Sequence, residues 1–293
     1  MNMKKLVGLL LAAILSLGLL AACAPAEEDT SKGEANDETI NLVSREDGSG
    51  TRGAFTEIVG ILVEENEIQV DQTYEEAVIQ NSTHGVLTTV AGDEFSIGYI
   101  SLGSLNDTVK AIKIDGVDAT ADNVLSGDFP IARPFNLAWQ EGLNDLTQDF
   151  LDFIMSEEGQ LIVEENGFVQ VENNGPYQGS GGEGNIVVAG STSVTPLIEK
   201  LAESYEALHQ GVTIEIQSTG SSAGMTSAME GTADIGMASR ELKDEENDTL
   251  ESLAMAIDGI AVIVHPDNPA ENLTVEQVRQ IFVGELTSWA ELE

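Results

Sequence analysis

The sequence predicts an α/β protein, because short apolar segments typical of strands alternate with amphipathic segments typical of helices. The clearest helix covers 194–208, where apolar side chains recur every three or four positions opposite a charged face. The chain has 293 residues, of which 42% are hydrophobic. That length is enough to bury one large core or two medium ones.

The predicted elements follow one another along most of the chain. The strand candidates are 40–44, 97–101, 109–114, 134–139, 186–189, 212–217, 233–237 and 260–264. The helix candidates include 51–63, 144–157, 194–208, 221–230 and 274–283. A Gly- and Asn-rich break at 172–185 has the composition of a linker or a surface loop.

The composition excludes several classes of function. With 51 acidic residues against 12 Lys and Arg, the formal charge is −39, so we expect no nucleic-acid partner, because such binding needs cations to neutralise phosphates. One cysteine cannot form a disulfide framework. The histidines at 84, 209 and 265 have no ligand spacing, so we expect no metal and no cofactor.

Residues 1–22 predict a lipoprotein signal peptide. Two lysines precede an apolar run at 6–20, which ends in Leu-Ala-Ala before Cys23 and resembles the lipobox of bacterial lipoproteins. The alternative is an ordinary signal peptide with an unrelated cysteine, but the single cysteine stands where lipidation requires it. We therefore expect a lipid anchor (palmitate) at Cys23 on the extracytoplasmic face of the cell membrane, followed by a flexible acidic tether over 23–39.

Four segments share a design in which a strand runs through a Gly/Ser/Thr turn into a helix start: 44–51, 188–193, 217–224 and 236–240. The free N–H groups at a helix N-terminus attract anions, and hydroxyl groups add donors. Arg45 and Arg240 add planar cations suited to an oxyanion. A single such turn is usually only a helix cap. Four of them predict an anion site, although sequence order does not show that they meet.

The motifs of hydrolases and nucleotide-binding enzymes are missing from the sequence. Asp47 stands where a Gly-x-Ser-x-Gly elbow would begin with glycine, and no Gly-Lys-Ser/Thr occurs. We therefore expect that the protein is not an enzyme. The alternative in that class is an exported phosphoester hydrolase with Ser49 or Thr192 as its nucleophile.

Several longer segments carry a family resemblance: SREDGSGTRGAF, IGYISLGSL, GSTSVTPLIEKLAE, STGSSAGM, GTADIGMASRELK, AIDGIAVIVHPDNP and LTVEQVRQIF. With them, the chain resembles the phosphate-binding lipoproteins of bacterial high-affinity phosphate ABC transporters. The resemblance implies a type II periplasmic-binding-protein fold, in which two α/β domains joined by a hinge hold the ligand in the cleft between them. It also implies a monomer that captures inorganic phosphate and delivers it to the permease subunits of an ABC transporter.

The order of these segments differs from the familiar arrangement, in which the GSTSVTP half comes first. The chain therefore looks like a circular permutant, with 172–185 joining the usual ends. In this order the resemblance implies a discontinuous domain of 40–133 plus 266–293 and a continuous domain of 134–265. The hinge is expected near 130–134 and 264–269.

The resemblance also implies the ligand-binding residues. From one domain these are Thr192 and Ser193 of the first loop and Ser221 of the second, with Ser239 supporting them. From the other domain they are Arg45, Ser49, Gly50 and Thr51, with Asp47 resembling the acid that orients Arg45.

Arg240 departs from the family pattern, because the best-known members carry there an aspartate that accepts the proton of bound phosphate and so rejects sulfate. We expect Arg240 to pair with the anion directly, while Asp47 or Glu46 accepts the proton, or selectivity is built differently. Sulfate, molybdate or arsenate therefore remain alternative ligands. A sensor or adhesin with a vestigial cleft is a further alternative.

Overall fold

The structure, a computed structural model, describes residues 39–65, 68–179 and 181–292. The predicted signal peptide, Cys23 and all but the last residue of the predicted tether lie outside these residues. Within the described ranges, no helix is long and apolar enough to cross a membrane. Helices and strands alternate along the chain, so the predicted α/β class is confirmed.

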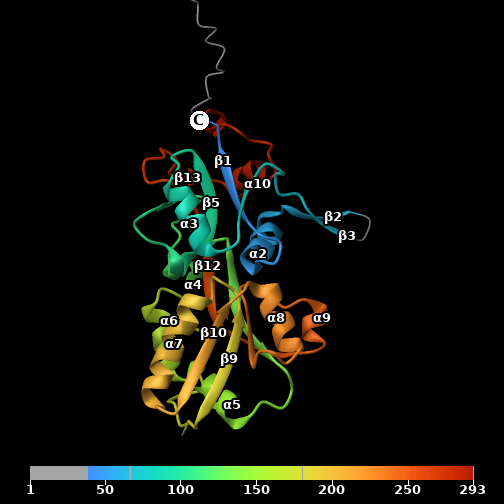
Figure 1. Cartoon of the computed structure of the whole chain (residues 1–293). Helices are drawn as coiled ribbons and strands as arrows, with labels where there is room; N and C mark the ends of the chain where they lie inside the picture. Colours follow the sequence, from blue (N-terminus) through green and yellow to red (C-terminus); the bar gives the residue numbers. More distant parts are fainter. Residues whose placement is uncertain (1–38, 66–67, 180, 293) are drawn as a thin grey trace, which may run out of the picture. The chain divides into compact units, whose positions relative to one another are not determined.

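Most of the described strands join one mixed sheet (Figure 1). Their order across it is β10 (Val212–Ser218), β9 (Gly184–Gly190), β11 (Ile235–Ala238), β8 (Ala132–Trp139), β12 (Glu251–Val264), β5 (Ser96–Ser101), β1 (Asn41–Arg45) and β4 (Val78–Gln80). β6 (Lys110–Ala111) also pairs with β12. Smaller sheets are formed by β2 (Leu62–Glu65) with β3 (Ile68–Asp71), and by β7 (Lys113–Ile114) with β13 (Asn272–Leu273).

Two large hydrophobic cores lie along the main sheet. The first is built mainly from residues of 40–131 and 260–282, and the second from residues of 135–256. We call the elements around them the first lobe and the second lobe. The first lobe contains the helices α2 (Gly50–Val59), α3 (Thr83–Ala91), α4 (Ala121–Ser126) and α10 (Val275–Phe282). The second contains α5 (Asp145–Ile154), α6 (Glu157–Glu165), α7 (Thr195–Leu208), α8 (Ser221–Met229) and α9 (Asp244–Asn247).

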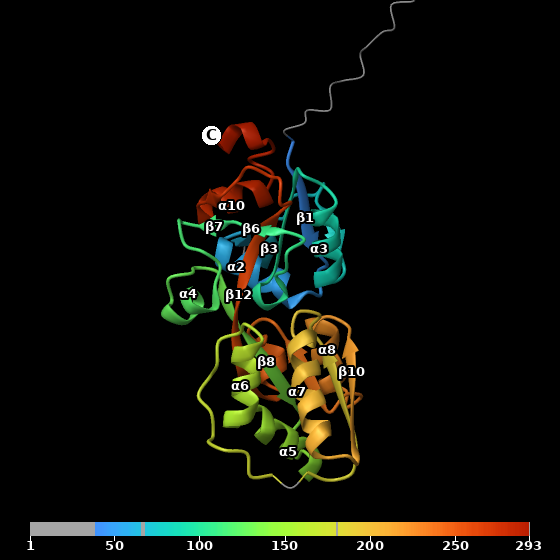
Figure 2. The same ribbon diagram turned by 90° about the vertical axis from the view of Figure 1, so that its left-hand side faces the viewer.

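In the second lobe, α5, α6 and α7 cover one face of the strands, while α8 packs on the other face (Figures 1 and 2). In the first lobe, α3 lies on one side of β1 and β5, and α2 packs with α10 on the other. Apolar stripes explain this arrangement. In α7, for example, Leu197, Ile198, Leu201 and Tyr205 are all buried in the second core.

Two antiparallel strands, β8 and β12, pass from one core to the other. At β8, Ile131, which directly precedes the strand, belongs to the first core, and Phe135 within the strand belongs to the second. On β12, pairing with β8 ends at Gly259, and pairing with β5 begins at Ile260. The expected position of this crossing, near 264–269, is therefore wrong. The reason is that the apolar run 260–264 packs in the first core, although we predicted it within the continuous domain 134–265.

Several predicted elements differ in their ends for local reasons. The helix predicted over 51–63 ends at Val59, because Gly60 adopts the left-handed conformation with φ of 79°. The helix predicted over 144–157 ends at Ile154, and the side chain of Ser156 then caps α6, which was not predicted. The strand predicted over 109–114 is divided into β6 and β7.

The first described residues lie beside the last ones. Thr39 forms an isolated bridge with Ser288, and the backbone N–H of Ile40 donates to the carbonyl of Thr287 over 2.8 Å. The Gly-rich segment 172–185 connects α6 to the start of β9 in the second lobe. This placement is the one that a permuted order predicts for the two ends of the fold.

Candidate anion-binding site

The loops predicted to bind an anion follow the carboxyl ends of strands in both lobes. In the first lobe, β1 ends at Arg45 and α2 begins at Gly50, and the side chain of Ser49 caps that helix by accepting from the Arg52 backbone N–H. In the second lobe, the strands that end before such loops are β9 at Gly190, β10 at Ser218 and β11 at Ala238. Three of the four segments run directly into a helix as predicted, but 236–240 does not, because α9 begins only at Asp244.

Gly50 brings the N-terminus of α2 against the second lobe. A Cβ atom added to Gly50 would stand 2.3 Å from Ser221 Oγ and 2.9 Å from Ser239 Oγ. Beside it, the carbonyl of Gly48 accepts from the Ser222 backbone N–H at 3.2 Å. Only a glycine at position 50 permits this approach, which brings the positive end of α2 to the serine loops of the other lobe.

Buried hydroxyl groups from both lobes form one connected network. Thr51 Oγ1 lies 2.8 Å from Ser193 Oγ and 3.2 Å from Ser239 Oγ. Ser191 donates to Ser239 Oγ over 2.9 Å, and Thr83 Oγ1 lies 3.0 Å from Ser193 Oγ. We call these five residues the hydroxyl cluster; none is more than 5% exposed. Because a hydroxyl both donates and accepts, each of them can turn its hydrogen toward an anion.

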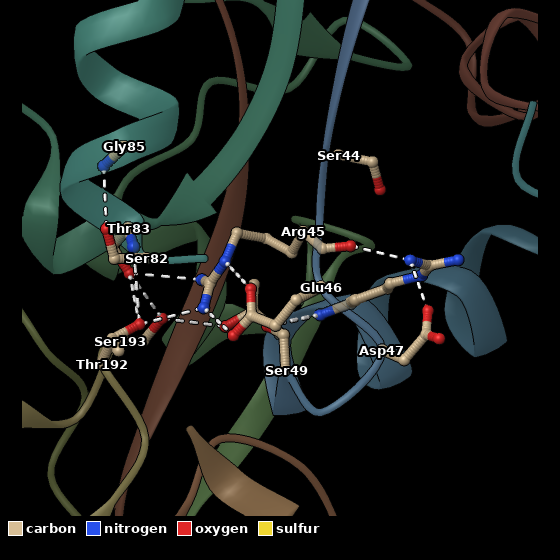
Figure 3. Close-up of polar contacts among 12 residues, drawn as sticks. Ser44, Arg45, Glu46, Asp47, Ser49, Ser82, Thr83, Gly85, Thr192 and Ser193 are labelled. Atoms are coloured by element: carbon tan, nitrogen blue, oxygen red, sulfur yellow. Dashed lines mark hydrogen bonds and ion pairs between the residues drawn. The ribbon is translucent and has the colours of Figure 1, made fainter. Parts of the chain in front are cut away.

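Arg45 extends from the end of β1 to the edge of the hydroxyl cluster (Figure 3). Its side chain is 3% exposed and forms a two-pronged ion pair with Glu46, at 2.8 Å through Nε and 2.9 Å through Nη2. Nη2 also donates to Thr192 Oγ1 of the second lobe over 3.0 Å. Arg45 is therefore a buried cation that reaches across both lobes while its carboxylate partner stays on its own loop.

The expectation that Asp47 orients Arg45 is wrong. The carboxylate of Asp47 is 96% exposed and pairs with Arg52 at 2.9 Å, while Glu46 holds Arg45. The longer side chain of Glu46 reaches the guanidinium of its neighbour, whereas Asp47 lies on the outer side of the loop. Arg52 itself donates to the backbone carbonyl of Arg45 over 2.8 Å, so Asp47 supports the loop only through Arg52.

Arg240, for which we expect direct pairing with the anion, already has a carboxylate partner in this structure. Its guanidinium forms a two-pronged pair with Glu246 of α9, at 2.7 Å and 2.8 Å, and donates to the carbonyl of Glu241. Burial favours the neutral form of Glu246, but hydrogen bonds from Arg240 and from the Lys243 backbone outweigh it and lower the pKa of Glu246. Arg240 is thus held by a carboxylate within the second lobe.

The other predicted residues lie where the loops meet. Ser221 is fully buried, and its Oγ accepts from the backbone N–H of Ser239 at 3.2 Å. Thr192 is partly exposed and contacts Arg45 and Thr83 of the first lobe. Together with Ser49, Gly50, Thr51 and Ser193, these predicted ligand residues come from loops of both lobes.

Three residues at this meeting point of the loops, Ser191, Thr83 and Arg133, are not among the predicted site residues. Thr83 opens α3 after the cap Ser82, so it belongs to a fifth strand–turn–helix segment, which was overlooked because β4 is only three residues long. Arg133 lies on the crossing strand β8, and its Nη2 is 3.4 Å from Thr51 Oγ1. No local pattern marks Arg133, because its partners are far away in sequence.

Comparisons with known proteins agree with this architecture. The model of the PBP superfamily domain matches residues 11–158 and 175–293. The phosphate-binding protein PstS 2 of Streptococcus agalactiae is 46% identical over 296 residues, which cover all of this chain and 99% of the relative. PstS 2 of Streptococcus pneumoniae is 46% identical over the whole of both chains.

A solved structure shows the same arrangement of elements. The crystal structure of a phosphate ABC transporter, phosphate-binding protein from Streptococcus pneumoniae has a TM-score of 0.70 and 50% identity. The structural alignment covers 87% of this chain and 100% of the Streptococcus pneumoniae chain. Because the sequence alignments run from end to end, these relatives carry the segments in the same order as this chain.

Proposed function

The chain belongs to the PBP superfamily and, within it, to the PstS phosphate-binding proteins, and we propose that it captures inorganic phosphate outside the cell and delivers it to the permease of an ABC transporter. The observation that carries this proposal is the bond from Arg45 of the first lobe to Thr192 of the second, beside the hydroxyl cluster. A buried cation with many hydroxyl donors is a site for a small oxyanion rather than for an extended ligand.

Binding and closure are linked in this site. Arg45, Thr51 and Thr83 belong to the first lobe, while Thr192, Ser193 and Ser239 belong to the second. An anion that accepts hydrogen bonds from both sets favours the conformation in which the lobes touch. The hydroxyl groups, which otherwise bond to one another, then donate to the ligand. The negative net charge does not prevent this, because donors in a buried site act at contact distance while surface charges are screened.

Selectivity for phosphate rests on Glu46. Of the two acceptors expected from the sequence, Asp47 faces solvent, whereas Glu46 lies against Arg45, with a side chain that is 27% exposed. A carboxylate at this position accepts the proton of hydrogen phosphate and repels sulfate, which has no proton to donate. Glu46 therefore replaces the aspartate whose position is taken by Arg240.

A calorimetric titration of the full chain with phosphate, sulfate and molybdate tests this proposal. We expect phosphate to bind at least about a hundredfold more tightly than sulfate, because sulfate has no proton to donate to the Glu46 carboxylate and is repelled by its charge. If sulfate or molybdate binds as tightly as phosphate, the assignment of phosphate as the ligand is wrong. Absence of binding by any oxyanion would instead favour the vestigial cleft of a sensor or adhesin.

The hydrolase alternative lacks an activated nucleophile. The hydroxyl of Ser49 caps α2, and that of Thr192 contacts Arg45 and Thr83. Among the described residues, no histidine or carboxylate bonds to either hydroxyl, although such a base is what activates serine or threonine. Turnover of a chromogenic phosphoester that disappears in Ser49→Ala would nevertheless restore the alternative.

The location of the protein is proposed from the lipobox-like segment that precedes Cys23. Lipidation of Cys23 holds the protein, as a monomer, on the extracytoplasmic face of the cell membrane, where phosphate enters the transporter. The variant Cys23→Ser removes the lipid-bearing thiol and is expected to release the protein from the membrane fraction into the medium. Unchanged membrane association of this variant, measured by fractionation, would exclude the anchor.

A further inference from the structure

Arg133 is a buried arginine at the point where β8 passes between the two cores. Its side chain is 3% exposed. Nη1 bonds to the carboxylate of Asp258 and, at 3.1 Å each, to the carbonyls of Asp258 and Gly259 on the other crossing strand. Nε donates to the Ser239 carbonyl over 3.3 Å, and Nη2 to Thr51 Oγ1 over 3.4 Å. One side chain thus joins both crossing strands to both lobes.

Asp258 holds this guanidinium in a fixed orientation. Its carboxylate is buried and also accepts from Ser101 Oγ at 2.7 Å and from the Gly103 backbone N–H at 3.3 Å. Burial lowers the pKa of Arg133 and raises the pKa of Asp258, and their mutual attraction opposes both shifts. Arg45 is the other charged group whose field reaches Arg133. Since the arginine remains a cation, its Nη2–H has a permanent direction toward Thr51.

The contact with Arg133 decides how the Thr51 hydroxyl behaves. A guanidinium only donates hydrogen bonds, so Thr51 Oγ1 must accept from it. The hydrogen of Thr51 itself is then free to be donated to Ser193, to Ser239 or to an anion. Ser221 is set in the same way, because its Oγ accepts from the Ser239 backbone N–H. The hydroxyl groups of Thr51 and Ser221 therefore have their hydrogens available for donation where the lobes meet.

We propose that Arg133 is a positioning residue of the anion site, which is held by Asp258 at the crossing of the two strands and makes Thr51 a hydrogen-bond donor to the bound anion. This inference rests on the proposed phosphate-binding function. It goes beyond that function because it assigns a role to a residue outside the loops that the family motifs mark. It also connects the ligand to the crossing strands, about which the lobes would move.

A double-mutant cycle on the full chain tests the proposal, with inorganic phosphate as the probe. Arg133→Lys keeps the charge but cannot reach Asp258 and Thr51 at once, and we expect about a tenfold weaker affinity. Thr51→Val removes the hydroxyl and should weaken binding by about as much, whereas Thr51→Ser, which keeps the hydroxyl, should lose less affinity than Thr51→Val. The double variant should bind no more weakly than the worse single variant, because both changes remove the same interaction.

The controls separate this role from general stability. Arg279→Lys changes an arginine that pairs with Glu276 and Glu285 in the first lobe, and it should leave the affinity unchanged. Thermal unfolding of every variant reports any loss of the fold. If the affinity losses of the two single variants multiply in the double variant, the proposal is overturned. Wild-type affinity in Thr51→Val would overturn it even if Arg133→Lys does not fold. A wild-type chain that does not bind phosphate would overturn the proposed function as well.

Discussion

Two arginines of the predicted site lie at or just after the ends of strands in different lobes, and each forms a two-pronged pair with a glutamate. Arg45 pairs with its neighbour Glu46 and still donates to Thr192 across the lobes. Arg240 pairs with Glu246 of α9 and donates to a carbonyl beside it, within its own lobe. Two arginines in similar sequence settings therefore differ in their contacts: Arg45 reaches the other lobe, whereas Arg240 bonds only within its own.

The strongest test of this difference is Arg45→Ala. We expect the affinity for phosphate to fall about a hundredfold or more, because the change removes the buried cation and leaves Glu46 to repel the anion. Isothermal titration calorimetry measures the loss, with Arg279→Ala as the control on an exposed ion pair. An unchanged affinity of the Arg45 variant would place the ligand elsewhere.

The matching change in the second lobe is Arg240→Ala. Its partner Glu246 has a side chain that is only 4% exposed, so the variant leaves a buried charge unpaired. We expect the free energy of unfolding to fall by about 3 kcal/mol, while the affinity for phosphate stays within about threefold of that of the wild type. Urea denaturation and calorimetry give the two values. A large loss of phosphate affinity without a loss of stability would indicate that Arg240 contacts the ligand.

Glu46→Gln tests the role of the glutamate that pairs with Arg45. The amide keeps the size of the side chain but no longer repels a fully ionised anion. The preference for phosphate over sulfate is expected to shrink about tenfold, since one charged acceptor is lost. Competition titrations measure the ratio, and Asp47→Asn is the matched control on the exposed neighbour. Equal effects of both variants would contradict the role of Glu46.

The smallest expected effect concerns acid stability. The pKa of Glu246 is lowered from its ordinary value of 4.5, so its ionised form is favoured in the folded state. Its contribution is therefore complete above about pH 4.5 and is lost as the pH falls through the lower folded value. The melting temperature of Glu246→Gln should vary less between pH 6 and pH 3 than that of the wild type. Identical pH profiles of the two proteins would show that the pair does not contribute.

Much of the site could be predicted because its parts are local. Ser49 caps the helix that follows it, and Gly50 and Thr51 lie in its first turn, so the strand–turn–helix pattern predicted this loop, and the family resemblance implied the residues within it. Thr192, Ser193 and Ser221 lie in loops that the same pattern predicted, and the family resemblance implied them as ligands. Thr83 was missed only because a three-residue strand precedes its helix. Prediction failed for Arg133, whose partners Thr51 and Asp258 are 82 and 125 residues away.

The sequence by itself determined the α/β class, the loops that precede the helices and the unusual order of the segments, because these depend on periodicity, capping and motif. Only the tertiary structure decided that Glu46 rather than Asp47 holds Arg45, that Glu246 holds Arg240, and that Arg133 reaches Thr51. The physical reason is that a charged side chain taken out of water must find a partner wherever the fold provides one. For a buried arginine, that choice is made by residues distant in the chain.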